Sequence, residues 1–329
     1  MQLFCNLSLL VVIIVSSAVA AHFNISLEEE QQIGVPIIDL RKVLNLSTNP
    51  TKKTEFKILE QTLHVDRSSG LAPSSRVTDQ TGWFKIEQST GILSQTKRID
   101  RDLLCGKVEL CFIQIIFLPG LYMSVMHLDV YIKDLNDNSP CFPSPSIEIN
   151  VSEDLEVNHE ISLDRYKATD VDLGNNSMIQ YTLLHHDVFF KARQYRDPVG
   201  HEHLSLVVSH ILDYEQTKVH RMLLLASDMG TSSQSSSVPL LIHLIDENDN
   251  KPNFEKTLYD VYLSENTPPG EILTRVQASD RDSGDLGYVH YVIPASDQDR
   301  REGYPPVSVN ETTGTVSLCE KLDYHVHNE

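Results

Sequence analysis

Short apolar stretches separated by polar breaks recur along most of this chain. Residues 204–208, 220–226 and 238–245 are rich in aliphatic side chains, and clusters of Gly, Ser, Asn and Asp lie between such stretches. This pattern is typical of β-strands joined by turns. No segment combines a long apolar stripe at helical spacing with helix start and stop signals. The sequence therefore predicts an all-β fold.

The N-terminus carries a different apolar pattern. Residues 9–15 form an uninterrupted apolar run, and Ala18-Val19-Ala20 follows with the small-x-small spacing of a cleavage site. This arrangement predicts a secretory signal peptide over residues 1–20, although the segment lacks the usual Lys or Arg. A short anchor or a buried strand is the other interpretation. No later stretch approaches the roughly 20 apolar residues that span a bilayer, so the mature chain is expected to be extracellular, and secreted if it ends at Glu329.

Several motifs recur at nearly one interval. The segment DLNDNSP at 134–140 returns 112 residues later as DENDNKP at 246–252. An Asp-x-Asp pair that begins at Asp170 returns at Asp280, with a tyrosine at the same distance after each. Such ordered recurrence indicates a tandem array, and short strands in a unit of this length predict a two-sheet antiparallel sandwich. The expected boundaries are a first repeat at 21–138, a second at 139–250 and a truncated third at 251–329.

Composition limits the class of function. The hydrophobic content of 40% is enough for packed cores, and the net charge of −19 argues against nucleic acid, whose phosphates attract basic surfaces. No nucleophile elbow or zinc-protease motif is present, so we expect neither an enzyme nor a small-molecule substrate. His201-x-His203 could bind a metal, but solvent-exposed loop histidines are the commoner meaning of such a pair.

The cysteines and sequons fit an extracellular chain. The spacing of Cys105 and Cys111 suits a local disulfide across a tight turn, whereas Cys141 and Cys319 have no obvious partner. Asn-x-Ser/Thr sequons predict glycosylation, with weak support from each because such triplets also arise by chance. The sequon residues are Asn24, Asn45, Asn150, Asn175 and Asn310.

The repeated D-x-N-D-N motif carries candidate metal ligands. Successive side chains of an extended strand point to opposite faces, so Asn136 and Asn138 are expected to face one way and Asp137 the other. Calcium prefers carboxylate, amide and carbonyl oxygens, and the motifs contain no His or Cys for softer metals such as zinc. An EF-hand is excluded because Asp285 and Tyr291 occupy the positions that would need Gly and a bidentate Glu.

The ordered set of acidic motifs resembles the calcium signature of the cadherin family. The motifs follow the family's order over essentially the whole mature chain: a Glu after the first strand, an acidic mid-repeat pair, D-x-N-D-N, D-x-D and a final Asp. The resemblance implies Greek-key, immunoglobulin-like sandwiches in an elongated rod, with calcium bound at each junction. At the first junction the implied ligands are Glu29 (with Glu28 as runner-up), Asp100, Asp102, Asn136, Asp137, Asn138, Asp170, Asp172, Asn176 and Asp228. At the second they are Glu153, Asp213, Glu215, Asn248, Asp249, Asn250, Asp280 and Asp282.

The chain departs from the family pattern at three places. Asp102 stands where the family has Glu, Tyr214 replaces the usual Arg, and Leu286 replaces an Asn. The shorter arm of Asp102 is expected to reduce its bidentate reach. The other two changes are expected to matter little, because the family's Arg is not a ligand and the Asn position can contribute a backbone carbonyl.

Two details resemble the protocadherin branch of the family. The segment RIDRDLLC followed by Cys111 is similar to the first protocadherin repeat with its small disulfide loop. Cadherins that swap an N-terminal strand need a tryptophan near the mature start. The only tryptophan of this chain, Trp83, lies instead in the middle of the first domain. The resemblance implies calcium-dependent, homophilic cell–cell adhesion through antiparallel repeats. The implied partner is the same protein on an opposing cell, and the implied membrane attachment is a C-terminal segment absent from this chain. A heterophilic receptor or a soluble decoy without homophilic adhesion is the alternative.

Overall fold

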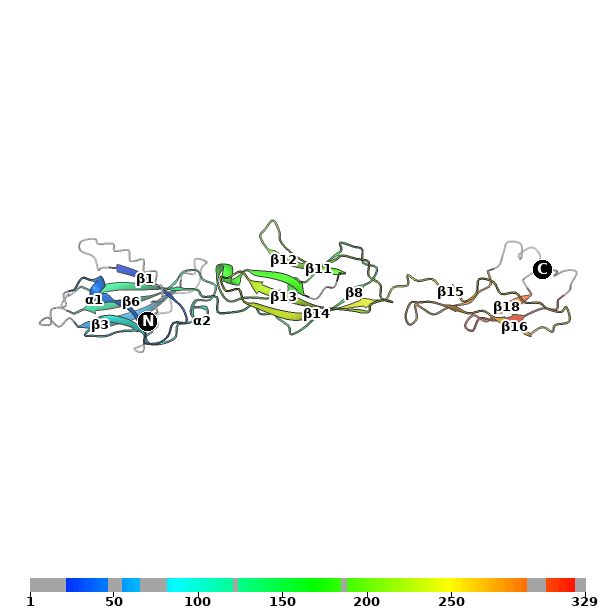
Figure 1. Cartoon of the computed structure of the whole chain (residues 1–329), viewed down its shortest axis with the longest axis horizontal. Helices are drawn as coiled ribbons and strands as arrows, with labels where there is room; N and C mark the ends of the chain where they lie inside the picture. Colours follow the sequence, from blue (N-terminus) through cyan, green and yellow to red (C-terminus); the bar gives the residue numbers. More distant parts are fainter. Residues whose placement is uncertain are drawn as a thin grey trace, which may run out of the picture.

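Three β-rich bodies lie end to end along one long axis (Figure 1). The computed structural model describes residues 22–46, 55–65, 82–120, 124–184, 188–294 and 306–322. The predicted signal peptide at 1–20 lies outside these residues and stays a prediction. Within the described ranges, no helix is long and apolar enough to cross a membrane.

The first body is a sandwich of two sheets. One sheet has the order β1-β7-β6-β3, formed by β1 (His22–Glu28), β7 (Met126–Lys133), β6 (Cys111–Pro119) and β3 (Phe56–Val65). The other has the order β2-β5-β4, formed by β2 (Pro36–Asp39), β5 (Ile92–Gln95) and β4 (Phe84–Ile86). The short helices are α1 (Leu40–Val43) and α2 (Arg101–Cys105). The first strand, β1, runs parallel to the last, β7.

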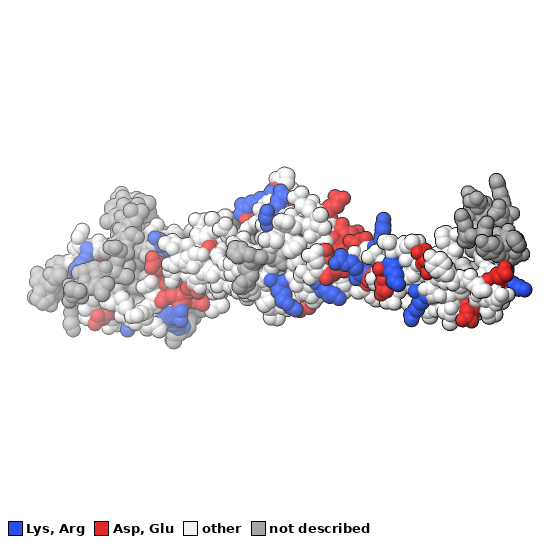
Figure 2. All heavy atoms as spheres, turned by 45° about the vertical axis from the view of Figure 1, so that its right-hand side comes forward, with Lys and Arg blue, Asp and Glu red and all other residues white. Residues whose placement is uncertain are grey.

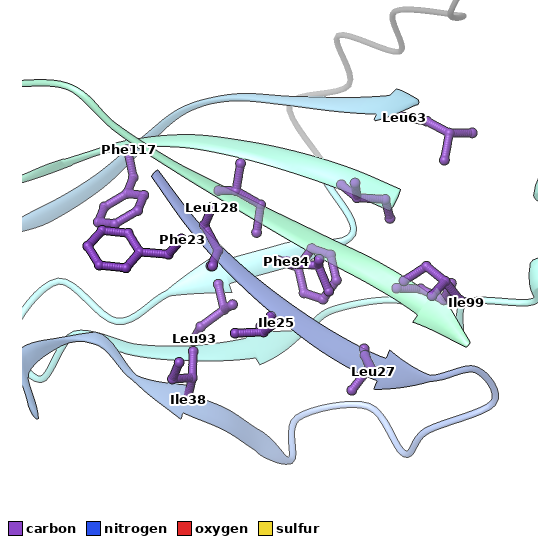
Figure 3. Packing of buried hydrophobic residues seen from close by; sticks show 14 of the residues in the cluster. Phe23, Ile25, Leu27, Ile38, Leu63, Phe84, Leu93, Ile99, Phe117 and Leu128 are labelled. Atoms are coloured by element: carbon purple, nitrogen blue, oxygen red, sulfur yellow. The ribbon is translucent and has the colours of Figure 1, made fainter. Parts of the chain in front are cut away.

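Strand β1 illustrates how the sequence sets the layers. Its residues alternate strictly between exposed and buried, with Phe23, Ile25 and Leu27 on the inner face, because side chains in a strand point alternately to its two faces. These three belong to one apolar cluster with Leu93 of the opposite sheet (Figure 3). Trp83 packs at the border of this cluster. The core of the first body therefore lies between its two sheets.

The second body repeats this architecture. Its larger sheet has the order β10-β13-β14-β8, formed by β10 (Ile179–Leu184), β13 (Val219–Asp228), β14 (Ser235–Ile245) and β8 (Ile147–Ser152). The smaller sheet, β11-β12-β9, is formed by β11 (Phe190–Arg196), β12 (Glu202–Val208) and β9 (Glu160–Ser162). The 3₁₀ turns are η1 (Asp164–Tyr166) and η2 (Gly174–Ser177). The three stretches expected to be strands lie within β12, β13 and β14, which confirms the all-β sandwich fold.

The third body is more open than the other two. A pair of short strands, β15 (Asn253–Phe254) and β17 (Ala278–Ser279), accompanies the sheet β16-β19-β18. That sheet is formed by β16 (Ile272–Arg275), β19 (Thr315–Leu318) and β18 (Val307–Val309). Among the described residues after 250, Leu318 alone is a buried apolar residue. The described part of this body therefore has little core of its own.

Candidate metal centres between the bodies

Acidic side chains concentrate where neighbouring bodies meet. Figure 2 shows two such clusters along the molecule. In the first junction, carboxylate oxygens lie within 4.8 Å of one another in two groups, which are Glu29, Asp102 and Asp137, and Asp102, Asp134 and Asp172. In the second junction the corresponding groups are Glu153, Glu215 and Asp246, and Glu215, Asp249 and Asp282. Each cluster draws its members from the bodies on both sides.

Strand β1 fixes the first glutamate of the first junction. Glu29 continues the buried face of β1 and is 1% exposed, whereas Glu28 points to solvent. The Glu29 carboxylate accepts hydrogen bonds from the backbone N–H of Arg101 and, at 3.0 Å, of Leu135. These bonds hold the end of β1 against helix α2 and against the linker that leaves the first body. Of the two candidate glutamates, Glu29 is therefore the one that lies in the junction.

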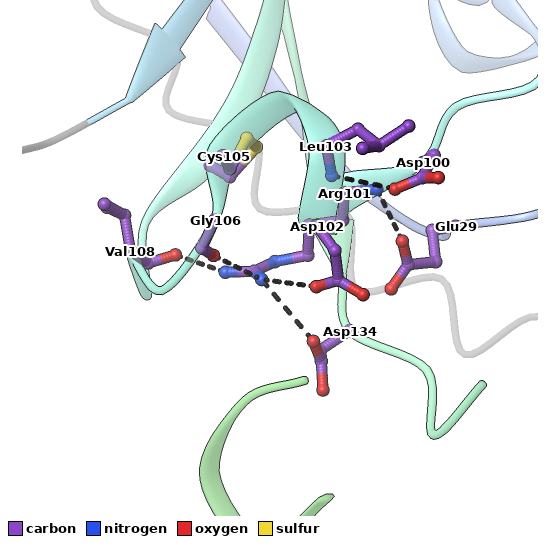
Figure 4. Close-up of a disulfide and its surroundings, with 10 residues drawn as sticks. Glu29, Asp100, Arg101, Asp102, Leu103, Cys105, Gly106, Val108 and Asp134 are labelled. Atoms are coloured by element: carbon purple, nitrogen blue, oxygen red, sulfur yellow. Dashed lines mark hydrogen bonds and ion pairs between the residues drawn. A yellow bond between two sulfur atoms is a disulfide. The ribbon is translucent and has the colours of Figure 1, made fainter. Parts of the chain in front are cut away.

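Helix α2 positions the mid-repeat acids, as Figure 4 shows. Asp100 is the N-cap of α2 and accepts a hydrogen bond from the Leu103 N–H at 2.8 Å, so one of its oxygens already has a donor. Asp102, in the first turn, belongs to both carboxylate groups of the junction. Asp100 belongs to neither. Of the predicted pair, Asp102 thus lies at the centre of the cluster and Asp100 at its edge.

Arg101 and Asp134 are unexpected members of this junction. The Arg101 side chain is 1% exposed, and its Nη1 lies 3.4 Å from Asp134 Oδ1 and 3.8 Å from Asp102 Oδ1 (Figure 4). The other Asp134 oxygen accepts hydrogen bonds from the second body, at 3.0 Å from a backbone N–H and at 2.9 Å from Asn176 Nδ2. Asp134 therefore ties the two bodies together directly. Its recurrence as Asp246 is the sequence signal that could have revealed it.

The linker contacts both bodies at once. Asn136 Nδ2 donates to Asp228 Oδ1 of the second body at 3.0 Å. Asn138 Nδ2 lies 2.8 Å from an Asp102 oxygen of the first body and 2.8 Å from an Asp172 oxygen of the second. The intervening Asp137 is more exposed than either asparagine. The linker is not a simple extended segment, because the Asp137 N–H donates to the Leu135 carbonyl at 2.9 Å in a tight turn. Asn138 Nδ2 donates to Asp137 Oδ1 at 2.9 Å, so these two side chains lie together and do not face opposite ways as expected.

Backbone donors orient the acids that the second body contributes. Asp172 is 0% exposed, and its N–H donates to Asp170 Oδ1 at 3.0 Å. Asp228, at the end of β13, accepts hydrogen bonds from the N–H groups of Gly230 and Gln234 at 2.9 and 2.8 Å. The carboxylates are consequently held in place by the fold of the second body.

Burial and mutual repulsion raise the pKa values of these acids. Burial, the largest cause, acts with the charges of Glu29 and Asp172 to raise the pKa of Asp102 from 3.8 to about 7. Burial is also the largest cause of the raised pKa values of Glu29, Asp137, Asp170 and Asp172. A cation among these oxygens would relieve the repulsion and favour their ionised forms.

Several buried oxygens in the junctions have no hydrogen-bond donor. In the first junction they are Asp102 Oδ1, Asn136 Oδ1 and Asp170 Oδ2. In the second they are Glu215 Oε1, Asp246 Oδ1 and Asp282 Oδ2. Because buried acceptors normally have donors, these atoms indicate a missing partner. Carboxylate and amide oxygens without nitrogen or sulfur ligands fit a hard cation such as Ca²⁺.

The second junction begins as the first does. Glu153 follows β8, is 4% exposed, and accepts hydrogen bonds from the backbone N–H of Tyr214 and, at 2.9 Å, of Glu247. This arrangement matches that of Glu29. Tyr214 occupies the position that Arg101 has in the first junction, so the second cluster lacks the corresponding buried guanidinium.

The linker of the second junction also bridges acids. Asn250 Nδ2 donates to Asp249 Oδ1 at 2.8 Å and to Asp282 Oδ1 at 2.7 Å. Asp246 accepts a hydrogen bond from the Ser283 N–H at 2.7 Å, as Asp134 accepts one from the second body. The pKa of Glu215 is raised, and burial is the largest cause. Of the predicted acidic ligands here, Asp213 and Asp280 lie outside the carboxylate groups, and Asn248 Nδ2 lies 3.4 Å from the Leu286 carbonyl oxygen.

The remaining sequence features lie on the surface or beside the first junction. A disulfide joins Cys105, the last residue of α2, to Cys111, the first residue of β6. Cys141 and Cys319 are exposed free thiols. The sequon asparagines are all exposed, which leaves each open to modification: Asn24, Asn45, Asn150, Asn175 and Asn310.

Comparison with known proteins identifies the family. A family model for the cadherin domain matches residues 147–245, which span β8 to β14. Human protocadherin gamma-B2 is 31% identical over 251 residues, which are 76% of this chain and 26% of that protein. The chain belongs to the cadherin superfamily. This cadherin spans about a quarter of the length of the curated relatives that it matches.

Solved structures agree with this assignment. The crystal structure of protocadherin gamma C5 EC1-3 matches with a TM-score of 0.75 and 27% identity, over 93% of this cadherin and 91% of that chain. The structure of protocadherin gamma B7 extracellular cadherin domains 1-4 matches with a TM-score of 0.71 and 26% identity, over 92% of this cadherin and 67% of that chain. The protocadherin resemblance is thereby confirmed. Because cadherins are adhesion proteins, family membership also supports the expectation that this cadherin is not an enzyme.

Proposed function

We propose that this cadherin mediates calcium-dependent cell–cell adhesion, with calcium bound at the two junctions. The observation that carries the proposal is the pair of acidic clusters in which buried oxygens have no donor. Bound calcium would supply the divalent positive charge that these clusters lack. The carboxylates and amides would then lock each linker against the bodies on both sides.

The proposed ligands are those that the family resemblance implies. In the first junction they are Glu29, Asp100, Asp102, Asn136, Asp137, Asn138, Asp170, Asp172, Asn176 and Asp228. In the second they are Glu153, Asp213, Glu215, Asn248, Asp249, Asn250, Asp280 and Asp282. The orphaned Asp102, Asn136, Asp170, Glu215 and Asp282 oxygens support five of these assignments. Asp134 is assigned a different role, because it already bonds Arg101 and the second body.

The proposed unit of the rod is the cadherin repeat. The division into residues 21–138, 139–250 and 251–329 is supported by the D-x-N-D-N linkers, which separate one sandwich from the next. Each linker would act as a hinge that is stiff when calcium is bound and flexible when it is removed. Small-angle scattering with calcium and then with a chelator tests this: the maximum dimension is expected to change, and an unchanged value would contradict the hinge.

The proposed partner is a second copy of the protein on an opposing cell, and the proposed location is the extracellular face of the plasma membrane. Similarity to protocadherins supports both proposals. One of the similar structures is itself described as extracellular cadherin domains. Antiparallel contact between the bodies of two such rods would give a homophilic bond between cells.

Bead aggregation tests the adhesive function. Beads coated with the whole chain should cluster in calcium, disperse in chelator, and fail to cluster when coated with Asp172→Asn. Glu148→Gln removes a negative charge from an exposed position on β8 and serves as the matched control. Clustering that is unaffected by chelator would overturn the calcium requirement. Clustering only with beads that carry a different protein would favour a heterophilic receptor.

A further inference from the structure

A cluster of histidines and carboxylates lies on the β11–β12 hairpin of the second body, apart from the proposed calcium ligands. The turn between the two strands brings Asp197 beside His201 and His203. Asp197 Oδ2 lies 3.2 Å from His201 Nδ1 and 3.4 Å from His203 Nε2. We propose that Asp197, His201 and His203 form a binding site for a zinc-class divalent ion.

The turn holds Asp197 in place through one of its two oxygens. Asp197 Oδ1 accepts hydrogen bonds from the backbone N–H of Val199 at 2.9 Å and of His201 at 2.8 Å. Gly200 has a φ of 99°, a conformation that glycine adopts at little cost and that closes the turn here. The other oxygen, Oδ2, is left facing both imidazoles.

A second carboxylate orients His203 from behind. Asp164 in η1 accepts a hydrogen bond from the Leu204 N–H at 2.8 Å through one oxygen, and its other oxygen lies 2.7 Å from His203 Nδ1. In the metal-free chain each ring nitrogen of His203 can donate a proton to one of the two carboxylates, and a zinc ion would take the place of the proton on Nε2. Tyr195 stacks on the same ring, with centroids 5.2 Å apart and planes at 25°. Carboxylates that orient a ligating histidine in this way are characteristic of zinc sites.

Two of the three separations between the ligand atoms correspond to those of a tetrahedral site. Zinc–nitrogen bonds of 2.0–2.1 Å place neighbouring ligand atoms about 3.3 Å apart. The distances of 3.2 and 3.4 Å from Asp197 Oδ2 therefore already correspond to two edges of such a site. The third edge, between His201 Nδ1 and His203 Nε2, is open, because these two atoms lie more than 4.8 Å apart. The His201 side chain is 73% exposed and has room to rotate toward His203, with water completing the coordination.

Calorimetric titration of the whole chain with ZnCl₂, in a millimolar excess of calcium that occupies the junctions, tests this site. One zinc ion per chain is expected to bind. The double substitution His201→Ala/His203→Ala should abolish that binding, and His210→Ala, at another exposed histidine of the same body, should leave it unchanged. Asp164→Asn should weaken the affinity by about 10- to 100-fold at unchanged stoichiometry, as expected for a residue that orients a ligand.

Two further measurements keep the outcome decisive. Calcium-dependent thermal unfolding of each variant checks that the second body is intact, so loss of zinc binding cannot be attributed to misfolding. Substitution by Co²⁺ should give visible absorption that disappears in the double variant. Equal zinc affinity of the double variant and the original chain, or no zinc binding by the original chain, would overturn the proposal. Neither result would affect the calcium junctions, because those are occupied throughout.

Discussion

At Asp172, removal of the negative charge is expected to have opposite effects on stability without and with calcium. Its side chain is 0% exposed, and its carboxylate belongs to a group with Asp102 and Asp134 in which the oxygens lie within 4.8 Å. Asp172→Asn keeps the shape of the side chain and removes one negative charge. Without calcium, the substitution should stabilise the first junction. With calcium, it should destabilise the junction, because a charged ligand is lost.

The magnitude follows from the geometry. Two unit charges at 4.8 Å repel by about 3.5 kcal/mol at an effective dielectric constant of 20. Asp172 faces two such charges, but Arg101 offsets much of that on Asp134, so about 3–4 kcal/mol of repulsion is removed. The amide and backbone N–H of Asn138 donate to Asp172 at 2.8 and 3.3 Å. Weakening these bonds costs about 1–2 kcal/mol. A net stabilisation of about 1–3 kcal/mol remains for the calcium-free chain.

Urea unfolding at pH 8, which lies above the raised pKa of about 7 of Asp102 in the folded chain, measures both effects. The free energy of unfolding of Asp172→Asn should exceed that of the original chain in chelator and fall below it in calcium. Glu148→Gln, at an exposed position, should change neither by more than about 0.5 kcal/mol. A loss of stability for Asp172→Asn of the same size in chelator and in calcium would refute the electrostatic reasoning.

Three other predictions concern the first body. In chelator, the free energy of unfolding should fall as pH rises from about 4 to 7, because the pKa of Asp102 is raised from 3.8 to about 7 in the folded chain. Urea titrations at several pH values should show a shallower fall for Asp102→Asn. Equal slopes for the variant and the original chain would contradict this. Removal of the disulfide by Cys105→Ser/Cys111→Ser should cost about 2 kcal/mol in the same assay, whereas an unchanged midpoint would exclude this contribution. Ile115→Ala, at a 0% exposed site in β6, should cost about 2–5 kcal/mol. Leu103→Ala, at an 84% exposed site, should cost less than about 0.5 kcal/mol and serves as its control.

The sandwich fold could be predicted because it depends on local alternation. In β1, the exposed and buried positions follow the polar and apolar residues one by one, and the same alternation carries Glu29 into the junction. The acidic motifs could be predicted because they recur in order. Spacing alone did not distinguish Asp100 from Asp102, since the capping of α2 by Asp100 depends on where the helix begins.

Long-range partners could not be predicted in the same way. Arginine is rarely buried, so nothing in the sequence marks Arg101 as the buried cation beside Asp134. The sequence likewise predicts only an exposed loop for His201-x-His203, because the carboxylate that orients His203 is distant in the sequence. Asp164, which orients His203, lies in η1, and β10 and β11 separate it from His203 in the sequence. Only the folded sandwich brings Asp164 Oδ2 within 2.7 Å of His203 Nδ1.

The parallel pairing of the first and last strands in each sandwich has a mechanical consequence. In the first body, β1 and β7 pair over seven residues in register, and in the second body β8 and β14 pair over six. The chain enters each body at the start of one strand and leaves at the end of its parallel neighbour. A force applied along the long axis to the two ends of such a body would therefore pull the two strands past each other lengthwise. Their hydrogen bonds would bear the load together, in shear, and would not open one at a time.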